Sequence, residues 1–408
     1  MSRIARIPII SIPLLIASSV ALGSPPQSQQ WEMLPPMPVK RSDHAASYFA
    51  ETGELVVAGG RVPAGEDQYT TATLDLDAQI WTVQYSPATG DVEATRRADG
   101  RWMLFDEGAC NSYDVLADVW TEEPALSETW RAATTLSTLA NGDVLVVGGF
   151  TDFITHATSL RFDPDTQAIV VTPMNQGRAA HTATTLREGI VLVAGGWRWS
   201  LIGDFEVQEP DTSAEVYNAA TGSWDSIASM STGRERHTAV LLPDGRVLVA
   251  GGLTLFFEGD FPGTMPTATA EIYDPWQGTW SSAAPMIEAR YGHTMTLLPS
   301  GRVLVTGGMS DSFGVLASAE AYDPATDSWI SLPPMAVARL HATATWVPGH
   351  GVVVAGGRTA ASLKTAVAEA ELYPIGQLAN GSECFIGDDC QSGVCKPSGV
   401  CGGKPTAD

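Results

Sequence analysis

The sequence predicts an all-β protein in which seven four-stranded units are arranged in a ring. The main observation is an eleven-residue pattern ending in Gly-Gly, which occurs at residues 50–60, 139–149, 186–196, 242–252, 298–308 and 347–357. Each copy contains a Gly-containing turn and then a short apolar run, which is typical of a strand buried on both faces. Repeats of roughly 42–56 residues indicate one repeating architecture rather than several separate domains.

Each repeat contains four predicted strands. An Arg, often with a His, precedes a threonine-rich strand such as 237–242, and the diglycine strand, such as 247–250, follows it. After a loop of variable length comes a Glu-x-Tyr strand such as 270–274, and then a strand that contains Trp280. Short strands joined by tight turns favour sheets repeated about an axis, because a solenoid would need capping units that the sequence lacks.

These motifs resemble those of the kelch-repeat family, whose marks are the diglycine, the Glu-x-Tyr-Asp step, the later Trp and the Arg-x-x-His opening. The resemblance covers about residues 31–376. It implies a seven-bladed kelch β-propeller over this range. It leaves the function open, because the family spans adaptors, oxidases and sugar-processing proteins.

The two ends of the repeat region indicate how the ring closes. Residues 31–44 match residues 329–341, so the repeat region begins with a fourth strand that has no first three. The last unit, 339–373, has three strands and no Trp strand. We therefore expect the N-terminal strand to complete the last sheet, which hides edges that would otherwise pair with other chains. The alternative is a six-bladed ring with residues 87–125 as an insertion, because Asp106-Glu107 replaces Gly-Gly in the second unit.

Both ends of the chain have features of an exported protein. Residues 1–23 begin with arginines and continue as an apolar stretch, which predicts a cleaved signal peptide followed by a linker at 24–30. An uncleaved membrane anchor is the alternative. The tail at 377–408 is Cys-rich and predicts two disulfides of open pairing, or a zinc site, from Cys384, Cys390, Cys395 and Cys401. We expect a secreted protein, extracellular or periplasmic.

The formal net charge of −23 limits the classes of partner that the protein can bind. Such acidity disfavours nucleic acids and anionic membranes as partners. We expect no membrane span after signal cleavage, and a monomer.

No catalytic constellation is identifiable in the sequence. Five of the seven histidines occupy one repeat slot, which favours a structural role: His44, His181, His237, His293 and His341. The galactose-oxidase-like branch of the resembled family binds copper through two histidines and two tyrosines, and one of the tyrosines is cross-linked to a cysteine. Its motifs do not align with this chain, and Cys110 has the character of a small buried apolar residue. We therefore expect no enzyme activity, no cofactor and no metal.

Arginines and aromatic residues single out one rim of the ring as the predicted binding surface. The loops at 197–213 and 253–269, each following a diglycine, are long and aromatic, and loops on a rigid scaffold often bind partners. We expect Arg178, Arg236, Arg290 and Arg339 to pair with the repeat glutamates Glu215, Glu271, Glu320 and Glu371. The predicted partner-binding residues are Arg61, Trp197, Arg198, Trp199, Phe205, Arg234, Phe256, Phe257 and Arg358.

The function predicted from the sequence is a secreted, non-catalytic binding or scaffold module. Its partner would be a protein or a polysaccharide that contacts the rim of loops that follow the diglycines. The alternative is a carbohydrate-active enzyme, either a glycan hydrolase or a galactose-oxidase-like copper oxidase.

Overall fold

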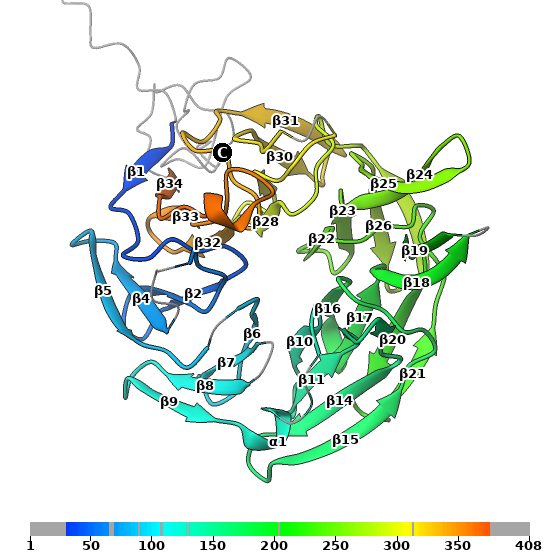
Figure 1. Cartoon of the computed structure of the whole chain (residues 1–408), viewed down its shortest axis with the longest axis horizontal. Coiled ribbons are helices and arrows are strands. Elements are labelled where there is room, and N and C mark those ends of the chain that lie inside the picture. The colour runs from blue at the N-terminus through cyan, green and yellow to red at the C-terminus, as the bar shows by residue number, and fades with distance from the viewer. Residues whose placement is uncertain are drawn as a thin grey trace, which may run out of the picture.

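The computed structural model describes residues 30–375, apart from 65–68, 89, 107, 108, 128, 130, 203, 204, 312 and 313. Across this part of the chain, seven four-stranded antiparallel sheets surround a central axis and form a β-propeller (Figure 1). The predicted signal peptide and the four tail cysteines, Cys384, Cys390, Cys395 and Cys401, lie outside the described residues. The described helices are all too short or too polar to cross a membrane.

The blades are numbered in the order in which their innermost strands occur in the chain, and the strands of each blade are given from the axis outward. Blade 1 consists of β2 (Ala45–Phe49), β3 (Glu54–Ala58), β4 (Thr70–Asp75) and β5 (Ile80–Tyr85). Blade 2 consists of β6 (Glu93–Arg96), β7 (Trp102–Phe105), β8 (Cys110–Asp114) and β9 (Val119–Glu122). Blade 3 consists of β10 (Thr135–Thr138), β11 (Val144–Val147), β14 (Thr158–Asp163) and β15 (Ala168–Pro173). Blade 4 consists of β16 (Thr182–Thr185), β17 (Ile190–Ala194), β20 (Ala214–Asn218) and β21 (Ser223–Ser226).

The remaining blades follow the same order from the axis outward. Blade 5 consists of β22 (Thr238–Leu241), β23 (Val247–Ala250), β26 (Ala270–Asp274) and β27 (Thr279–Ala283). Blade 6 consists of β28 (Thr294–Leu297), β29 (Val303–Thr306), β30 (Ala319–Asp323) and β31 (Ser328–Leu332). Blade 7 consists of β32 (Thr343–Val347), β33 (Gly351–Ala355), β34 (Ala370–Pro374) and, from the N-terminus, β1 (Glu32–Leu34).

Hairpins and short helices lie outside the blades. The hairpins pair β12 (Phe150–Thr151) with β13 (Ile154–Thr155), β18 (Trp197–Ile202) with β19 (Phe205–Pro210), and β24 (Leu253–Glu258) with β25 (Phe261–Pro266). Thus the loops that follow the diglycines in blades 3, 4 and 5 are themselves β-hairpins. The helical turns are α1 (Pro124–Ser127), η1 (Arg187–Gly189) and η2 (Leu363–Thr365).

The second repeat forms a complete blade. Its strand β7 pairs with β6 on one side and with β8 on the other, and β9 completes the sheet. The seven-bladed prediction is therefore confirmed, and the six-bladed alternative with 87–125 as an insertion is wrong.

The ring is closed by the N-terminal strand, as the sequence predicts. In β1, Glu32 pairs with Leu372 and Leu34 pairs with Ala370 of β34. Trp31 donates its indole N–H to the carbonyl oxygen of Pro333 at 2.8 Å. β1 covers the outer edge of β34. Blade 7 therefore has four strands like the other blades, with β1 as its outermost strand.

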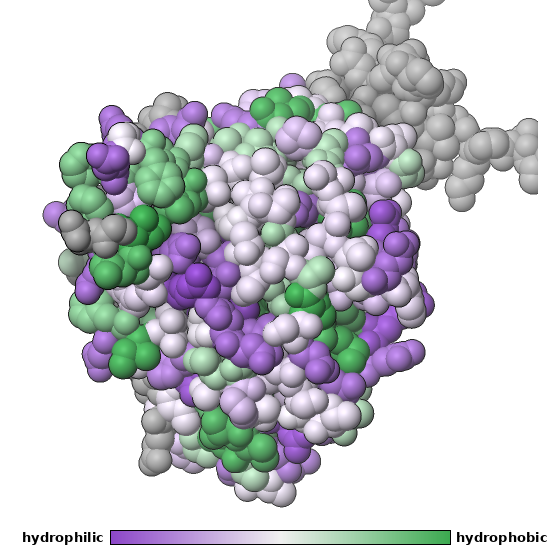
Figure 2. Space-filling model, turned by 90° about the vertical axis from the view of Figure 1, so that its right-hand side faces the viewer, coloured by the Kyte–Doolittle hydropathy of each residue, from purple (hydrophilic) through white to green (hydrophobic). Residues whose placement is uncertain are grey.

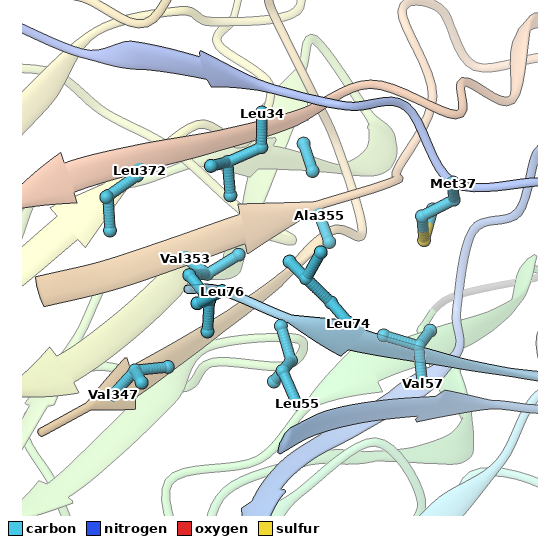
Figure 3. Packing of buried hydrophobic residues seen from close by; sticks show 11 residues of the cluster. Leu34, Met37, Leu55, Val57, Leu74, Leu76, Val347, Val353, Ala355 and Leu372 are labelled. Carbon is cyan, nitrogen blue, oxygen red and sulfur yellow. The ribbon is translucent and has the colours of Figure 1, made fainter. Parts of the chain in front are cut away.

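Apolar clusters fill every junction between neighbouring blades in the described part of the ring. Figure 3 shows the junction at the closure, where side chains of blade 7 face side chains of blade 1. Leu34, contributed by β1, lies above Leu372, and both belong to the same cluster as Leu55 and Leu74 of blade 1. The closing strand therefore contributes to the core as well as to the sheet.

The diglycines allow neighbouring blades to approach each other closely. Gly195 and Gly196 have φ values of 63° and 93°, in the left-handed region that favours glycine. The N–H of Gly196 donates to the carbonyl oxygen of Arg234 in the next blade at 2.9 Å. A Cβ atom on Gly195 would lie 2.6 Å from that oxygen, so a larger residue would separate the blades.

In four blades the repeat arginine and the repeat glutamate form a buried ion pair. The N–O distances lie between 2.5 and 2.9 Å in the pairs Arg178–Glu215, Arg234–Glu271, Arg290–Glu320 and Arg339–Glu371. The predicted pairing is confirmed for three arginines and wrong for Arg236. Arg234 takes that place because the repeat motif is Arg-x-x-His, with the arginine three residues before His237.

Candidate functional site

A cavity of about 580 Å³ opens where the innermost strands of the blades begin. Every blade contributes to its lining, so the cavity lies on the axis of the ring. Most lining residues come from two places in the repeat, the segment around the start of the innermost strand and the segment at or just after the diglycine; blades 5 and 6 contribute only the first.

A chain of backbone hydrogen bonds fixes the residues around this cavity. Arg236 donates its N–H to the oxygen of Ala180 at 3.1 Å, and His341 donates to Gly292 at 3.0 Å. Asp43 then donates to His341 at 3.1 Å. The non-glycine residues of this chain have left-handed φ values of 50–56°, and such backbone strain often occurs at functional sites. The side chain at this position varies, so each blade can present a different group at the mouth.

Four of the repeat histidines connect neighbouring blades. Their Nε2 atoms form hydrogen bonds with threonine hydroxyls at 2.7–3.0 Å in the pairs His44–Thr343, His181–Thr135, His237–Thr182 and His293–Thr238. Loss of hydration lowers the pKa of both His44 and His237 to about 3, with nearby arginines adding to the effect. These imidazoles are therefore neutral and have a structural contact.

His341 differs from the other four histidines. It lies one residue earlier in the repeat, and Ala342 occupies the slot of the linking histidine. Its Nδ1 atom is 3.1 Å from the Oδ1 atom of Asp43, and both residues line the cavity. Burial lowers the pKa of His341 to about 4, although Asp43 opposes this shift. The shared slot predicted for five histidines is thus correct for four.

Blade 2 places two carboxyl groups in the cavity. Glu93 is the first residue of its innermost strand, where five other blades have threonine. Solvent reaches its side chain through the cavity, but loss of bulk hydration, followed by repulsion from Asp91, raises its pKa to about 8. Asp106 takes the place of the first glycine and lies beside Phe105, which pairs with Glu93 across the sheet. Both residues thus line the cavity, although Asp106 is largely buried and its carboxylate accepts the N–H of Ala109 at 2.6 Å.

Arginines line the same cavity. Arg61 and Arg358 each follow the diglycine, in blades 1 and 7, and Arg61 forms an ion pair with Asp91. Arg236 lies near Glu235, with an N–O distance of 3.8 Å. Arg131, in blade 3, also lines the cavity.

The predicted binding residues fall into three groups. Arg61, Trp197 and Arg358 line the cavity, although Trp197 is only 2% exposed. Arg198, Trp199, Phe205, Phe256 and Phe257 lie on the hairpins of blades 4 and 5. Arg234 is fully buried in its ion pair with Glu271, so its inclusion in the binding set is wrong. The arginine of blade 5 that lines the cavity is Arg236.

The hairpins form an apolar wall beside the cavity. Phe150 and Trp197, which line the cavity, have ring centroids 5.2 Å apart. Trp199 continues the contact outward, and its ring lies 5.7 Å from Phe153, whose side chain is 78% exposed. Figure 2, which views the side that carries β18, β19, β24 and β25, shows the largest group of hydrophobic residues at the upper left and smaller groups elsewhere on this face.

The predicted binding set leaves out several residues of the cavity, although the sequence already indicates that Asp106 and Arg236 lie on this rim. The residues left out are Asp43, Asp91, Glu93, Asp106, Arg131 and Arg236. The signal was present, because most of these residues replace a small or uncharged residue at an equivalent position in other repeats. A comparison of the repeats slot by slot would have found them.

The described lining of the cavity does not offer the ligands of a copper–tyrosine site. It contains no tyrosine or cysteine, and the linking histidines already contact threonines. Cys110 is buried in the core between blades 2 and 3, where loss of hydration raises the pKa of its thiol. Within the described residues, no three His, Cys, Asp or Glu side chains are grouped closely enough to bind a metal ion.

Comparisons with known proteins agree with this architecture. The Kelch motif family matches residues 236–287 and 289–336, which span blades 5 and 6. Galactose oxidase of Gibberella zeae is 36% identical over 101 residues, 24% of this chain and 14% of that protein. Kelch-like protein 6 of Homo sapiens is 37% identical over 71 residues, 17% of this chain and 10% of that protein. The chain therefore matches only a small part of these relatives.

A solved structure resembles the whole propeller. It is a fungal alcohol oxidase of the AA5 family in complex with copper, with a TM-score of 0.66 and 19% identity over 85% of this chain and 76% of that chain. Together with the Kelch motifs, this likeness supports the predicted resemblance to the kelch and galactose oxidase superfamily. The expectation that the chain is not an enzyme is corrected, because galactose oxidase is among its relatives by sequence.

Proposed function

We propose that the protein is a carbohydrate-active enzyme of the glycan hydrolase type, with its active site in the axial cavity. The observation that carries this proposal is Glu93. It replaces a threonine of the repeat, faces a cavity large enough for a sugar ring, and has a pKa of about 8. A carboxyl group that keeps its proton near neutral pH is suited to act as a general acid.

Asp106 is the second carboxyl group in this proposal. Glycoside hydrolysis commonly uses two carboxyl groups that flank the bond to be broken. Glu93 would give its proton to the glycosidic oxygen as the bond between that oxygen and the sugar carbon breaks. Asp106 would take a proton from the water molecule that adds to that carbon. That both residues line the same cavity supports this pairing of roles.

The hairpins beside the cavity would bind the rest of the glycan. Galactose oxidase, by its name, acts on a sugar, which supports a carbohydrate substrate here. Phe205 and Phe261, from different hairpins, have ring centroids 5.4 Å apart and are both exposed. Aromatic rings present a large apolar area to the faces of sugar rings. We place this activity outside the cytoplasm, in accordance with the predicted signal peptide.

The oxidase chemistry of the relatives is not part of this proposal. A copper–tyrosine centre needs ligands that the cavity lining does not supply. Metal analysis of the purified protein tests this point, and we expect copper well below one ion per chain. Copper at one ion per chain, together with oxidation of galactose, would replace hydrolysis with oxidation as the proposed reaction.

The decisive test is the release of reducing ends from a panel of polysaccharides. We expect Glu93→Gln to lower kcat by roughly 10²–10⁴-fold, which is the usual contribution of a general acid. Glu122→Gln is the matched control, because Glu122 is an exposed residue of the same blade outside the cavity. Wild-type protein that releases no reducing ends from any member of the panel would reject the proposal.

A further inference from the structure

Arg131 of blade 3 holds the position that Arg178 holds in blade 4. Its Nη1 group donates to the carbonyl oxygens of Gly148 and Thr158 at 3.2 and 2.9 Å, as Arg178 does at the equivalent places. The Nη2 group of Arg178 then donates to Glu215 at 2.9 Å. Arg131 has no such carboxylate within ion-pair distance among the described residues.

The missing partner has a simple cause in the sequence. Leu160 faces Val146 across the blade 3 sheet, just as Glu215 faces Val193 in blade 4. Leu160 is 2% exposed and packs in an apolar cluster. Blade 3 therefore keeps the arginine of the repeat but has lost its glutamate.

The guanidinium of Arg131 lies at the cavity. Arg131 is among the lining residues and is partly exposed, whereas the four paired arginines are fully buried and are not part of the lining. Leaving a charge partly desolvated without a counter-charge costs free energy, so the position favours an anion. Partial burial also lowers the pKa of Arg131, which is consistent with this cost.

A second arginine faces the same cavity without a carboxylate. Arg358 forms no ion pair within the described part of the chain, and its Nε atom is buried without a hydrogen bond. Arg131 and Arg358 thus line one cavity without an ion pair among the described residues, in a chain whose formal net charge is −23. Phe150 and Trp197 line the cavity near Arg131 and provide apolar surface for a ring.

We propose that Arg131 binds the carboxylate of an acidic sugar, so that the substrate of this site is a uronate-containing glycan. The inference rests on the proposed function for the choice of a sugar, but the binding itself does not require turnover. A guanidinium group matches a carboxylate with two parallel hydrogen bonds. Blade 3 follows blade 2, so the bound carboxylate lies on the side of the cavity that holds Glu93 and Asp106.

Calorimetric binding of short oligogalacturonate and oligomannuronate, each compared with a neutral oligosaccharide of the same length, tests the proposal. We expect the wild-type protein to prefer the acidic member of each pair. Arg131→Gln should weaken binding of the acidic sugar about tenfold or more, since a charge-assisted hydrogen bond is lost, and should leave neutral binding unchanged. Arg161→Gln is the control, because Arg161 lies in the same blade but pairs with Asp143 outside the cavity.

A second variant avoids the loss of the backbone contacts of Arg131. Leu160→Glu restores the arginine–glutamate pair that four other blades contain, and it should abolish the preference for acidic sugars. Leu160→Gln has the same size without the charge and should keep the preference. Circular dichroism and thermal melting establish that each variant is folded.

The outcomes separate this inference from the proposed function. Equal wild-type affinity for acidic and neutral sugars would overturn it, as would unchanged acidic binding in Leu160→Glu or tighter binding of a short poly-glutamate peptide. Arg131-dependent binding of an acidic sugar that is never cleaved would support the inference and reject hydrolysis. Cleavage of neutral glycans alone would support hydrolysis and reject the inference that the substrate is acidic.

Discussion

Arg339 and Glu371 form an ion pair at 2.5 Å in which neither side chain is exposed to solvent. The carboxylate of Glu371 also accepts the backbone N–H groups of Ala336 and Val337 at 2.6 and 3.1 Å. The pair therefore connects the turn that enters blade 7 to the third strand of that blade. Equivalent pairs in blades 4, 5 and 6 repeat this connection around the ring.

Breaking one of these pairs should destabilise the protein strongly. Glu371→Gln leaves the guanidinium of Arg339 buried without a counter-charge, which costs about 3–5 kcal/mol of unfolding free energy in comparable sites. Urea unfolding at neutral pH measures the change. Asp323→Asn, which removes the partner of the partly exposed Arg302, is the control and should cost about 1 kcal/mol or less. Equal effects of the two substitutions would contradict a structural role for the buried pair.

Acid should destabilise the propeller through its linking histidines. The pKa of His237 is about 3 in the folded protein, and its ordinary value is 6.5. The unfolded chain therefore binds more protons, so the stability that this residue contributes is complete above pH 6.5 and is lost as the pH falls toward 3. His237→Gln should reduce the slope of unfolding free energy against pH by up to about 1.4 kcal/mol per pH unit in this window.

Thr182→Val provides the control for the histidine experiment. It removes the hydroxyl that contacts His237 but keeps the titrating imidazole. Stability should fall at every pH, and the slope below pH 6.5 should stay that of the wild type. A wild-type slope in His237→Gln would show that this histidine is not the group that responds to acid.

Glu93 should lower stability at alkaline pH, because its carboxyl group resists ionisation in the fold. Its folded pKa of about 8 lies above its ordinary value of 4.5. The stability it contributes is complete below pH 4.5 and is lost as the pH rises through 8. Thermal melting of Glu93→Gln should therefore show a growing gain over the wild type between pH 4.5 and 8, and a constant gain above that. A gain that does not change with pH would contradict the raised pKa.

The pH dependence of turnover should report the same group. Hydrolysis needs the protonated form of Glu93, so kcat should fall as the pH rises through about 8. Progress curves at saturating substrate between pH 6 and 10 measure this limb of the profile. Glu122→Gln should show the same fall in kcat as the wild type. If the fall does not occur near pH 8, the general acid is a group other than Glu93.

Most of the fold could be predicted from the sequence because each repeat carries its own evidence. The diglycine, the Glu-x-Tyr step and the match between residues 31–44 and 329–341 are local patterns with a direct structural cause. The predicted pairing is wrong by two residues in one repeat, because two arginines precede His237 and the Arg-x-x-His spacing, confirmed by burial, selects Arg234 over Arg236. The hairpin of blade 4 could have been predicted as well, because residues 197–201 and 205–208 alternate apolar and polar side chains.

The site was largely missed for a different physical reason. Its residues are far apart in the chain and are brought together only by the closure of the ring, as for Asp43 and His341. No short motif marks the cavity. Its residues are recognisable instead as substitutions within the repeat, such as Glu93 in place of threonine. The loss of the glutamate opposite Arg131 shows in the sequence as Leu160 in the slot of Glu215, and the sheet register confirms this placement.

Closure by the N-terminal strand should be essential for stability. Trp31 bonds to Pro333 and packs against Tyr373, with ring centroids 5.1 Å apart. Trp31→Ala should lower the free energy of unfolding by about 2–4 kcal/mol, because a large partly buried ring and a hydrogen bond are lost. Met33→Ala, at an exposed position of the same strand, should have little effect in the same urea titration. Since the ring unfolds as a unit only if its ends are joined, Trp31→Ala should also broaden the transition as blade 7 opens first. A sharp transition at the wild-type midpoint would show that the strand adds no stability.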